Sequence, residues 1–226
     1  MAQETTDSPQ GIIQLTGTVF DGKTVKVNYN SLPGAHPKTM GYFVAIWQGS
    51  QIQALSEAKS TQKITTDDQA GTANFTDLAL QKQDYIIGFG VDFGVGTTIC
   101  ATLMVPKTVK PNDPLSPFLS SVVVPESGIG TNSLIATYVT PLYNTPATNN
   151  NWIALFPGPF TANCFAGAGV IATSDATSDN NTGSISMNDI PNGLINFETY
   201  TLVYGMSSTS GKPNYSDIIG YYTFTI

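Results

Sequence analysis

Hydrophobic and polar residues alternate along several short segments of the chain, while other segments are apolar throughout. Alternation with a period of two predicts a strand that buries one face and exposes the other. The alternating segments are residues 24–29, 72–76 and 184–187. Residues 85–91 and 200–205 are continuous runs of aliphatic, aromatic and small residues, which predict interior strands. Residues 221–226 form a further β-branched and aromatic run.

Turn-forming residues fall between these segments. Proline, glycine, asparagine and aspartate cluster at residues 33–34, 67–68, 94–96, 157–159, 180–181 and 191–193. Only residues 53–63 have a helical pattern, and it is weak. Roughly seven short strands in each stretch of about 110 residues are typical of a Greek-key β-sandwich. The sequence therefore predicts an all-β protein built from immunoglobulin-like sandwiches.

The chain also contains an internal repeat. Three matching pairs are separated by 109 positions: Tyr29 and Tyr138, Ala45 and Ala154, and Gly49 and Gly158. Two pairs are separated by 112 positions: Gly71 and Gly183, and Asp77 and Asp189. Two more are separated by 115 positions: Tyr85 and Tyr200, and Gly90 and Gly205. The separation grows only where loops would lengthen. This pattern predicts that one fold unit of about 110 residues has been duplicated in tandem.

The repeat predicts two β-sandwich domains, at residues 11–106 and 118–226. Residues 107–117 are rich in proline and lack periodicity, so we expect a semi-rigid linker there. Residues 1–10 are polar, and we expect them to be flexible.

Four segments of the second repeat carry a family resemblance. They are Ala136–Thr140, Asn150–Phe156, Tyr200–Tyr204 and Ile219–Phe224. Their order resembles that of the SKICH-type immunoglobulin-like domain, a family of non-catalytic interaction modules. Asn151 stands where that family has aspartate, Ala154 replaces its glycine, and the first repeat has Phe43 in place of its tryptophan. The resemblance implies a β-sandwich that binds a partner rather than a substrate.

Composition narrows the classes of partner. Charged residues make up 11% of the chain, against roughly a quarter in an average globular domain. Threonine, serine, asparagine and glycine take their place, and this composition favours a secreted or cell-surface protein. The first residues show no signal-peptide pattern, so a cytoplasmic location stays open. The net charge is −7 and arginine is absent, so we do not expect a nucleic-acid partner. No apolar run is long enough to span a bilayer, so we expect no membrane insertion.

The sequence shows no catalytic arrangement. His36, the only histidine, lies in a loop between two prolines without a nucleophile-elbow pattern, and the four glutamates have no evident partner. We therefore expect neither enzyme activity nor a cofactor. One histidine and two distant cysteines do not make a zinc site. We expect Cys100 and Cys164 to be buried free thiols, with a bridge between the domains as the alternative.

Calcium is the one metal that the sequence leaves open. The candidate ligands are Asp67, Asp68, Asp175 and Asp179, which lie in equivalent loops of the two repeats. Oxygen-rich loops bind Ca²⁺, but no loop here has the twelve-residue pattern that ends in glutamate. Turn formation explains aspartate at these positions equally well.

Aromatic residues supply the candidate ligand site. Those expected beside loops or strand ends are Trp47, Tyr143, Phe160, Phe165 and Tyr215. Aromatic rings among asparagine and threonine are how sugar-binding sandwiches stack on sugar rings, so these residues are a candidate glycan platform. The alternative is that they belong to the core. We expect Trp152, which begins the apolar run 152–156, to fill the core between the two sheets.

The first expected strand is a candidate for assembly. Residues 11–20 carry no charge, whereas natural edge strands are usually protected by lysine or proline. Ile12, Ile13 and Leu15 could therefore add to a neighbouring copy, or the segment could pair within its own domain. The sequence as a whole predicts a non-enzymatic interaction or adhesion module that binds a protein or glycan partner. The alternative is a structural self-assembling protein, as in a surface filament, a sheath or an inclusion body.

Overall fold

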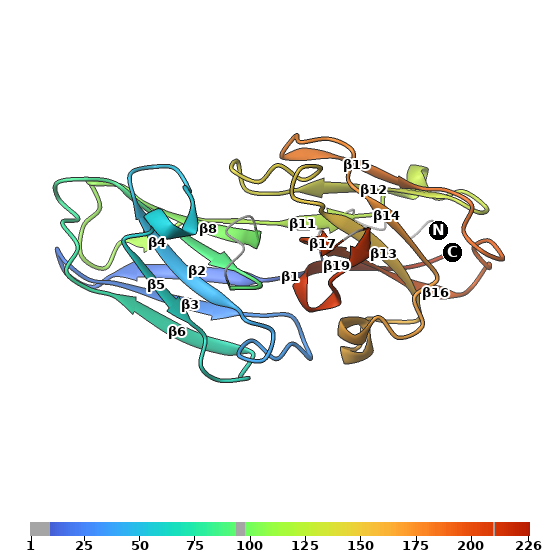
Figure 1. Cartoon of the computed structure of the whole chain (residues 1–226), viewed down its shortest axis with the longest axis horizontal. Coiled ribbons are helices and arrows are strands. Elements are labelled where there is room, and N and C mark those ends of the chain that lie inside the picture. The colour runs from blue at the N-terminus through green and yellow to red at the C-terminus, as the bar shows by residue number, and fades with distance from the viewer. Residues whose placement is uncertain (1–9, 94–97, 210) are drawn as a thin grey trace, which may run out of the picture. The chain divides into compact units, whose positions relative to one another are not determined.

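A computed structural model describes residues 10–93, 98–209 and 211–226 (Figure 1). The described part of the chain is an all-β protein of antiparallel sheets, as the sequence predicted. It divides into two compact units. Among the described residues, the N-terminal unit comprises 13–120 and 140–144, and the C-terminal unit comprises 10–12, 121–139 and 145–226.

The N-terminal unit contains two sheets, with strand orders β10-β8-β7-β4-β5 and β6-β3-β2-β9. Their strands are β2 (Gln14–Val19), β3 (Val25–Asn30), β4 (Phe43–Gln48), β5 (Ser60–Lys63), β6 (Ala70–Phe75), β7 (Tyr85–Gly90), β8 (Ile99–Val105), β9 (Pro114–Leu115) and β10 (Pro117–Leu119). The two sheets face each other, because Tyr29 of β3 packs against Phe89 of β7 with ring centroids 5.4 Å apart.

The C-terminal unit contains one larger sheet, in the order β1-β19-β16-β13-β14, and a smaller one, β11-β12-β15. Their strands are β1 (Gly11–Ile12), β11 (Ser121–Val123), β12 (Leu134–Val139), β13 (Trp152–Pro157), β14 (Ala172–Asp175), β15 (Thr182–Met187), β16 (Thr199–Gly205) and β19 (Ile218–Thr225). A short ribbon of β17 (Ser208–Thr209) and β18 (Lys212–Pro213) and the 3-10 helices η3 (Glu126–Gly128), η4 (Ala162–Ala166) and η5 (Tyr215–Asp217) complete the unit.

The two sheets of each unit differ in how they are buried. Strands β3 and β12 alternate between buried positions and positions that are exposed or half-buried, as the alternating sequence predicts. By contrast, the first five residues of both β4 and β13 are buried, and β7 is buried throughout. Strands buried on both faces read as continuous apolar runs. The larger sheets must therefore carry a second layer of side chains on the face turned away from the sandwich.

Trp152 belongs to this second layer. Ile153 and its cross-strand partner Tyr204 face the smaller sheet, because Tyr204 stacks on Tyr138 of β12 at a centroid distance of 5.5 Å. Trp152 lies one position away on the same strand and so points to the opposite face. There Tyr215 covers it, with ring centroids 5.3 Å apart. The prediction that Trp152 is a buried core residue is confirmed, but its expected position between the sheets is wrong.

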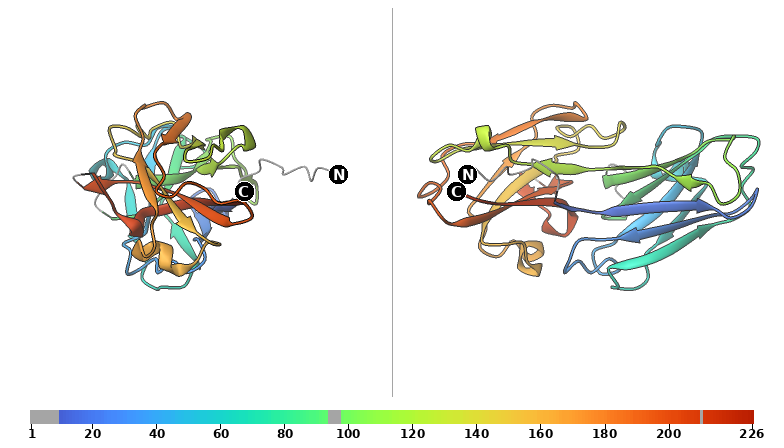
Figure 2. Two further views of the ribbon diagram at one scale, coloured as in Figure 1. Left: turned by 90° about the vertical axis from the view of Figure 1, so that its right-hand side faces the viewer. Right: turned by 180° about the vertical axis from the view of Figure 1, so that it is seen from behind.

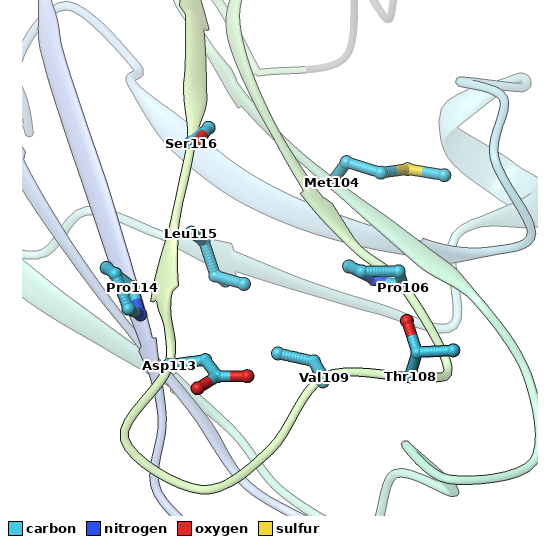
Figure 3. A pocket seen from close by; sticks show the side chains of 8 residues that line it. All are labelled: Met104, Pro106, Thr108, Val109, Asp113, Pro114, Leu115 and Ser116. Carbon is cyan, nitrogen blue, oxygen red and sulfur yellow. The ribbon is translucent and has the colours of Figure 1, made fainter.

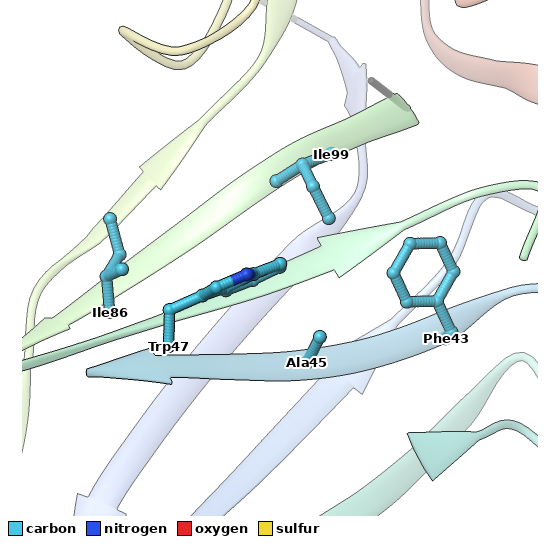
Figure 4. Close-up of a cluster of buried hydrophobic side chains, with 5 residues drawn as sticks. All are labelled: Phe43, Ala45, Trp47, Ile86 and Ile99. Atoms are coloured by element: carbon cyan, nitrogen blue, oxygen red, sulfur yellow. The ribbon is translucent and has the colours of Figure 1, made fainter. Parts of the chain in front are cut away.

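The N-terminal unit has the same second layer (Figure 4). Its buried members are Phe43, Ala45, Trp47, Ile86 and Ile99. Partly buried residues pack against them: Ile52, Leu55, Ala58 and Phe93. Most of these covering residues come from the irregular segment between β4 and β5, which contains the 3-10 helix η1 (Leu55–Glu57). The segment predicted as weakly helical is therefore the cover of an outer core.

Equivalent positions of the predicted repeat have the same surroundings in both units. Tyr29 lies opposite Gly71 in the pairing of β3 with β6, and Tyr138 lies opposite Gly183 in the pairing of β12 with β15. In both pairs a side chain at the glycine position would overlap the tyrosine hydroxyl, so the two tyrosine rings lie flat across the neighbouring strand. The match fits the predicted repeat, while descent by duplication stays a prediction.

A second pair of equivalent glycines marks a bulge. The register of β7 with β8 shifts at Gly90, and the register of β16 with β19 shifts at Gly205. Gly90 lies under the ring of Phe43, and Gly205 lies under the ring of Trp152. Any larger residue would collide with these rings, so the outer layer of each unit requires glycine at its bulge.

The structure divides the chain differently from the predicted boundaries. Residues 107–117 are not a free linker: within them β9 pairs with β2, and Pro117 begins β10, which pairs with β8. Proline lacks an N–H and is tolerated at such edge positions, so a proline-rich stretch forms strands here. Residues 11–12 belong to the C-terminal unit as β1, although the sequence assigned them to the first domain. Of the predicted flexible segment, residues 1–9 lie outside the described residues.

Candidate functional site

The outer edge of β19 in the C-terminal unit holds a short strand from a distant part of the sequence. Gly11 pairs with Tyr221 and Ile12 pairs with Gly220, so β1 extends the larger sheet (Figures 1 and 2). Gln10 continues this ladder with its side chain. Its Nε2 donates to the carbonyl of Thr223 at 2.8 Å, and its Oε1 accepts from the N–H of Thr223 at 3.0 Å. One glutamine amide thus imitates the peptide group of a further strand residue.

Tyr221 fixes the identity of the residue that docks. Its ring lies across Gly11, and a side chain at position 11 would overlap that ring. A second aromatic ring holds Tyr221 in place. Phe160 stacks on Tyr221 with ring centroids 4.0 Å apart and planes 3° from parallel. This edge therefore accepts glycine at position 11, because the ring of Tyr221 occupies the space that a side chain there would need.

Three of the five predicted glycan-platform residues lie on this same outer face. Phe165 contacts Phe160 edge to face at 5.7 Å, and Phe160 stacks on Tyr221. Tyr215 of η5 covers Trp152 and also contacts Phe156 at 6.1 Å. All three predicted residues are half-buried. Their ring faces are occupied by one another and by the strands beneath, so the cluster covers β13 and β19 instead of forming an open platform.

The other two predicted platform residues lie in the N-terminal unit. Trp47 is fully buried in the outer layer, and its Nε1 donates to the carbonyl of Ala54 at 3.2 Å. A glycan cannot reach this ring, so the prediction for Trp47 is wrong. Tyr143 is 38% exposed, and its hydroxyl donates to the carbonyl of Ser50 at 2.8 Å.

The predicted assembly strand is split between the two units. Ile12 is half-buried on β1, at the docking edge. Ile13 and Leu15 are buried core residues of the N-terminal unit, where Leu15 pairs with Tyr29. They are not available for assembly, because β2 has β3 on one side and β9 on the other. Of the three predicted assembly residues, Ile12 alone lies at the docking edge, and its role in assembly stays a prediction.

Two of the predicted calcium ligands have another role. Asp67 accepts hydrogen bonds from the N–H and the hydroxyl of Thr39, both at 2.9 Å, and Asp179 accepts the same pair from Thr148, both at 2.8 Å. The backbone hydrogen bond is the main cause that lowers the pKa of each carboxyl group. Each aspartate closes a loop, which is the turn chemistry given as the alternative.

No group of three potential metal-ligating side chains is present among the described residues. Asp68 lies in the loop between β5 and β6, and Asp175 ends β14 opposite Trp152. The structure therefore does not gather the four aspartates into one site. Cys100 and Cys164 are both buried and free, as expected.

A hollow of about 400 Å³ lies inside the segment that the sequence assigned to the linker (Figure 3). Its walls are mostly apolar and include Met104, Pro106 and Leu115. The one carboxylate there, that of Asp113, accepts a hydrogen bond from the N–H of Lys110 at 2.8 Å. The hollow lacks the converging polar groups that orient a ligand.

Sequence reasoning missed Gln10 and Tyr221, the two residues that define the docking edge. Tyr221 belongs to an aromatic strand, and nothing in its neighbourhood along the chain distinguishes it from a core residue. The partner of Gln10 is Thr223, 213 positions away. A contact of that separation has no local signal in a single sequence. The absence of charge from residue 11 to residue 20 was the only pointer to it.

Comparisons with known proteins find similarity at the level of solved structures. No protein-family model matches the chain, and no curated protein matches its sequence. One similar solved structure is described as "Biofilm associated protein - BSP domain", at 11% identity and a TM-score of 0.26. The match covers 89% of this chain but 28% of that chain, so this chain spans little more than a quarter of it. No family model supports the resemblance to the SKICH-type domain, which therefore stays an expectation. In the described part of the chain, no helix has the length and apolar character needed to cross a membrane.

Proposed function

We propose that this protein is a non-enzymatic interaction module of adhesive or structural type, and that its partner is a second copy of itself. The contact is the addition of Gln10–Ile12 from one copy to the β19 edge of the other. The observation that carries the proposal is the fit of this edge to a short strand with glycine at its centre. Gln10 completes the ladder, and Tyr221 accepts only glycine beneath its ring.

The order of the units along the chain allows two copies to exchange β1 at a small cost in free energy. Residues 10–12 belong to the C-terminal unit, while residues 13–120 belong to the N-terminal unit. The strand and the unit that receives it are thus connected through a different unit. When β1 comes from a second copy, every contact at the β19 edge is kept, and only the path of the chain at Ile12 and Ile13 changes. Exchange of an identical element is a low-cost route to dimers for this reason.

The chemistry of the contact suits a surface with few charges. The ladder consists of backbone groups and one neutral amide, and the cover consists of aromatic rings. Such contacts are little affected by salt, whereas exposed ion pairs are screened. Residues 10–12 and 220–223, which form the ladder, include no charged side chain, so no charge within the contact itself opposes the approach of the strand. The low share of charged residues in the chain, 11%, also supports a location outside the cell.

Gly11→Val tests the proposal. The new side chain overlaps the ring of Tyr221, so β1 cannot dock in either copy. The measurement is the mass of the parent and the variant by light scattering after size exclusion, over a series of protein concentrations and at low and high salt. We expect the parent to associate as concentration rises, with little dependence on salt, and the variant to stay monomeric.

Gly22→Val is the matched control, because a side chain at Gly22 would meet only the far end of Gln81 at 4.0 Å. It should associate like the parent. Circular dichroism checks that Gly11→Val keeps its strand content. A parent that is monomeric at every concentration, or a Gly11→Val variant that associates as the parent does, would overturn the proposal. So would association that falls steeply with added salt.

A further inference from the structure

The N-terminal unit has a hollow of about 380 Å³ between the edge strands of its two sheets. Strand β5 borders it on one side, β6 borders it on the other, and the loop that joins them closes one end. In their sheets β5 pairs with β4 and β6 pairs with β3, and both strands are edges. Each therefore keeps backbone groups unpaired on its free side. The volume lies within the range of ~300–1,000 Å³ that is usual for small-molecule sites.

Tyr29 forms the floor of this hollow. It is 7% exposed, and its ring packs against Phe89 and across Gly71. Its hydroxyl lines the hollow and has no hydrogen-bond partner among the described residues of the chain. The hydroxyl is not one of the fully buried side-chain atoms that lack a partner, so it is open to the hollow and a ligand can reach it. The hydroxyl of Tyr29 is thus placed to bond with something that enters the hollow.

The equivalent residue of the C-terminal unit shows what a closed site looks like. The hydroxyl of Tyr138 lies 3.4 Å from the carbonyl oxygen of Ser178 and donates to that of Asn180 at 3.1 Å. Its ring stacks on Tyr204, whereas the ring of Tyr29 is tilted by 41° against Phe89. Of two equivalent tyrosines, one is satisfied by its own loop and the other faces an open space. This difference is specific to the N-terminal unit and is not a property of the fold.

The groups around Tyr29 are mainly acceptors. Gln62 donates through Nε2 to the carbonyl of Asn74 at 2.6 Å, which fixes the amide and leaves Oε1 as an acceptor. Asp68 also lines the hollow. Burial first, and then the charge of Asp68, raise the pKa of Tyr29, so its hydroxyl keeps its proton and acts as a donor at neutral pH.

Lys63 also lines the hollow, but its ammonium group is turned toward the outer layer. Lys63 pairs with Phe43, which belongs to the outer layer, and its Nζ lies 4.0 Å from the ring centroid of Phe93. Because that ammonium group is held against Phe93, the carboxylate of Asp68 disfavours an anionic ligand. An apolar ligand would leave the Tyr29 hydroxyl unpaired. The combination of one hydroxyl donor with a carboxylate and an amide oxygen matches a ligand whose neighbouring groups both donate and accept, as the hydroxyls of a sugar do.

We propose that the hollow between β5 and β6 binds a single sugar unit of a glycan, with Tyr29 donating to a ring or hydroxyl oxygen and with Asp68 and Gln62 accepting from sugar hydroxyls. This site is in the N-terminal unit and does not depend on exchange of β1. It also differs from the aromatic platform expected from the sequence, because recognition here is by hydrogen bonds at the edge of the sandwich.

The test is titration of ¹⁵N-labelled protein with glucose, galactose and N-acetylglucosamine, followed by amide chemical shifts. We expect at least one sugar to shift the amides of residues 62–73 progressively and saturably. Tyr29→Phe keeps the ring and removes the donor, so it should weaken binding about tenfold, the size of effect expected for one buried hydrogen bond. Asp68→Asn, which places at position 68 the residue found at the equivalent Asn180, should weaken it as well.

Tyr138→Phe is the matched control, since it removes the equivalent hydroxyl in the other unit, and it should bind like the parent. Tyr29→Phe is expected to fold normally because no protein group loses a hydrogen bond. Its amide spectrum away from residues 62–73 verifies this. Absence of saturable shifts with all three sugars would overturn the proposal. Equal binding by Tyr29→Phe and the parent would do the same.

Discussion

Removal of the Trp152 side chain should be among the most destabilising single changes in the C-terminal unit. The residue is 0% exposed, its ring lies on Gly205, and Tyr215 covers it. Its Nε1 also donates to the carbonyl of Ser207 at 2.8 Å. Truncation of a buried tryptophan to alanine costs about 3–5 kcal/mol through the lost burial and the cavity that remains. Total stabilities are about 5–15 kcal/mol, so Trp152→Ala would remove a large share.

Two further variants separate the contributions at this position. Trp152→Phe introduces the residue that occupies the equivalent position in the N-terminal unit, Phe43. It keeps a ring but loses the Nε1 donor, and we expect a cost of about 1–2 kcal/mol. Phe197→Ala is the surface control, because Phe197 is 92% exposed; its cost should stay within about 0.5 kcal/mol.

The assay is urea unfolding followed by circular dichroism, with the midpoint and the slope fitted for each variant. A cost of about 3 kcal/mol lowers the thermal midpoint of a unit of this size by at least about 12 °C, so calorimetry gives an independent check. The reasoning is refuted if Trp152→Ala unfolds within about 0.5 kcal/mol of the parent. It is also refuted if Phe197→Ala costs as much as Trp152→Ala, since burial would then not be the cause.

Three further predictions concern single side chains. Tyr138→Phe should lower the free energy of unfolding by about 1 kcal/mol because a buried donor is lost, while Tyr29→Phe should change it by no more than about 0.5 kcal/mol; paired urea curves measure both. The pKa of Asp179 is lowered in the folded state by its bonds from Thr148, so its stabilisation is present above the ordinary aspartate pKa of about 3.9 and is lost as pH falls below it. Asp179→Asn should accordingly reduce the fall of the urea midpoint below about pH 4. Burial raises the pKa of the Cys164 thiol, so a disulfide reagent at mildly alkaline pH should modify it only after unfolding; rapid modification of the native protein would contradict this placement.

The fold was predictable from the sequence because burial leaves a periodic record in strands. Residues 24–29 alternate because β3 has one buried face, and residues 85–91 do not alternate because β7 is covered on both. The cover itself was not predictable. It comes from irregular segments such as the one around η1, whose apolar residues have no period and so do not indicate which face they protect.

The domain boundary was misjudged for a related reason. A proline-rich stretch without periodicity resembles a linker, but residues 114–119 form edge strands whose partners lie in β2 and β8. Edge strands need fewer backbone donors, so proline is compatible with them. Composition alone does not distinguish an edge strand from a linker.

The sequence indicated which types of residue gather in the candidate site, but it did not indicate how those residues are exposed or arranged. The aromatic residues Phe160, Phe165 and Tyr215 do gather on one face, but they cover strands instead of exposing a platform. Trp47 was assigned to a surface because nothing in the sequence shows the second layer that buries it. Asp67 and Asp179 were assigned to equivalent loops, and their shared role became apparent only with the threonines that they bind.

The long separation between β1 and β19 also has a consequence for the time at which the C-terminal unit is completed. Gln10 and Thr223 are 213 positions apart, so a ribosome adding 5–20 residues per second needs on the order of 10–40 s to pass from one to the other. Throughout that interval the docking strand has no β19 to pair with. If copies exchange β1 as proposed, a strand from a neighbouring chain that was finished earlier competes with the chain's own once β19 emerges. Crowded synthesis would then favour linked copies, and slow, dilute synthesis would favour self-contained ones.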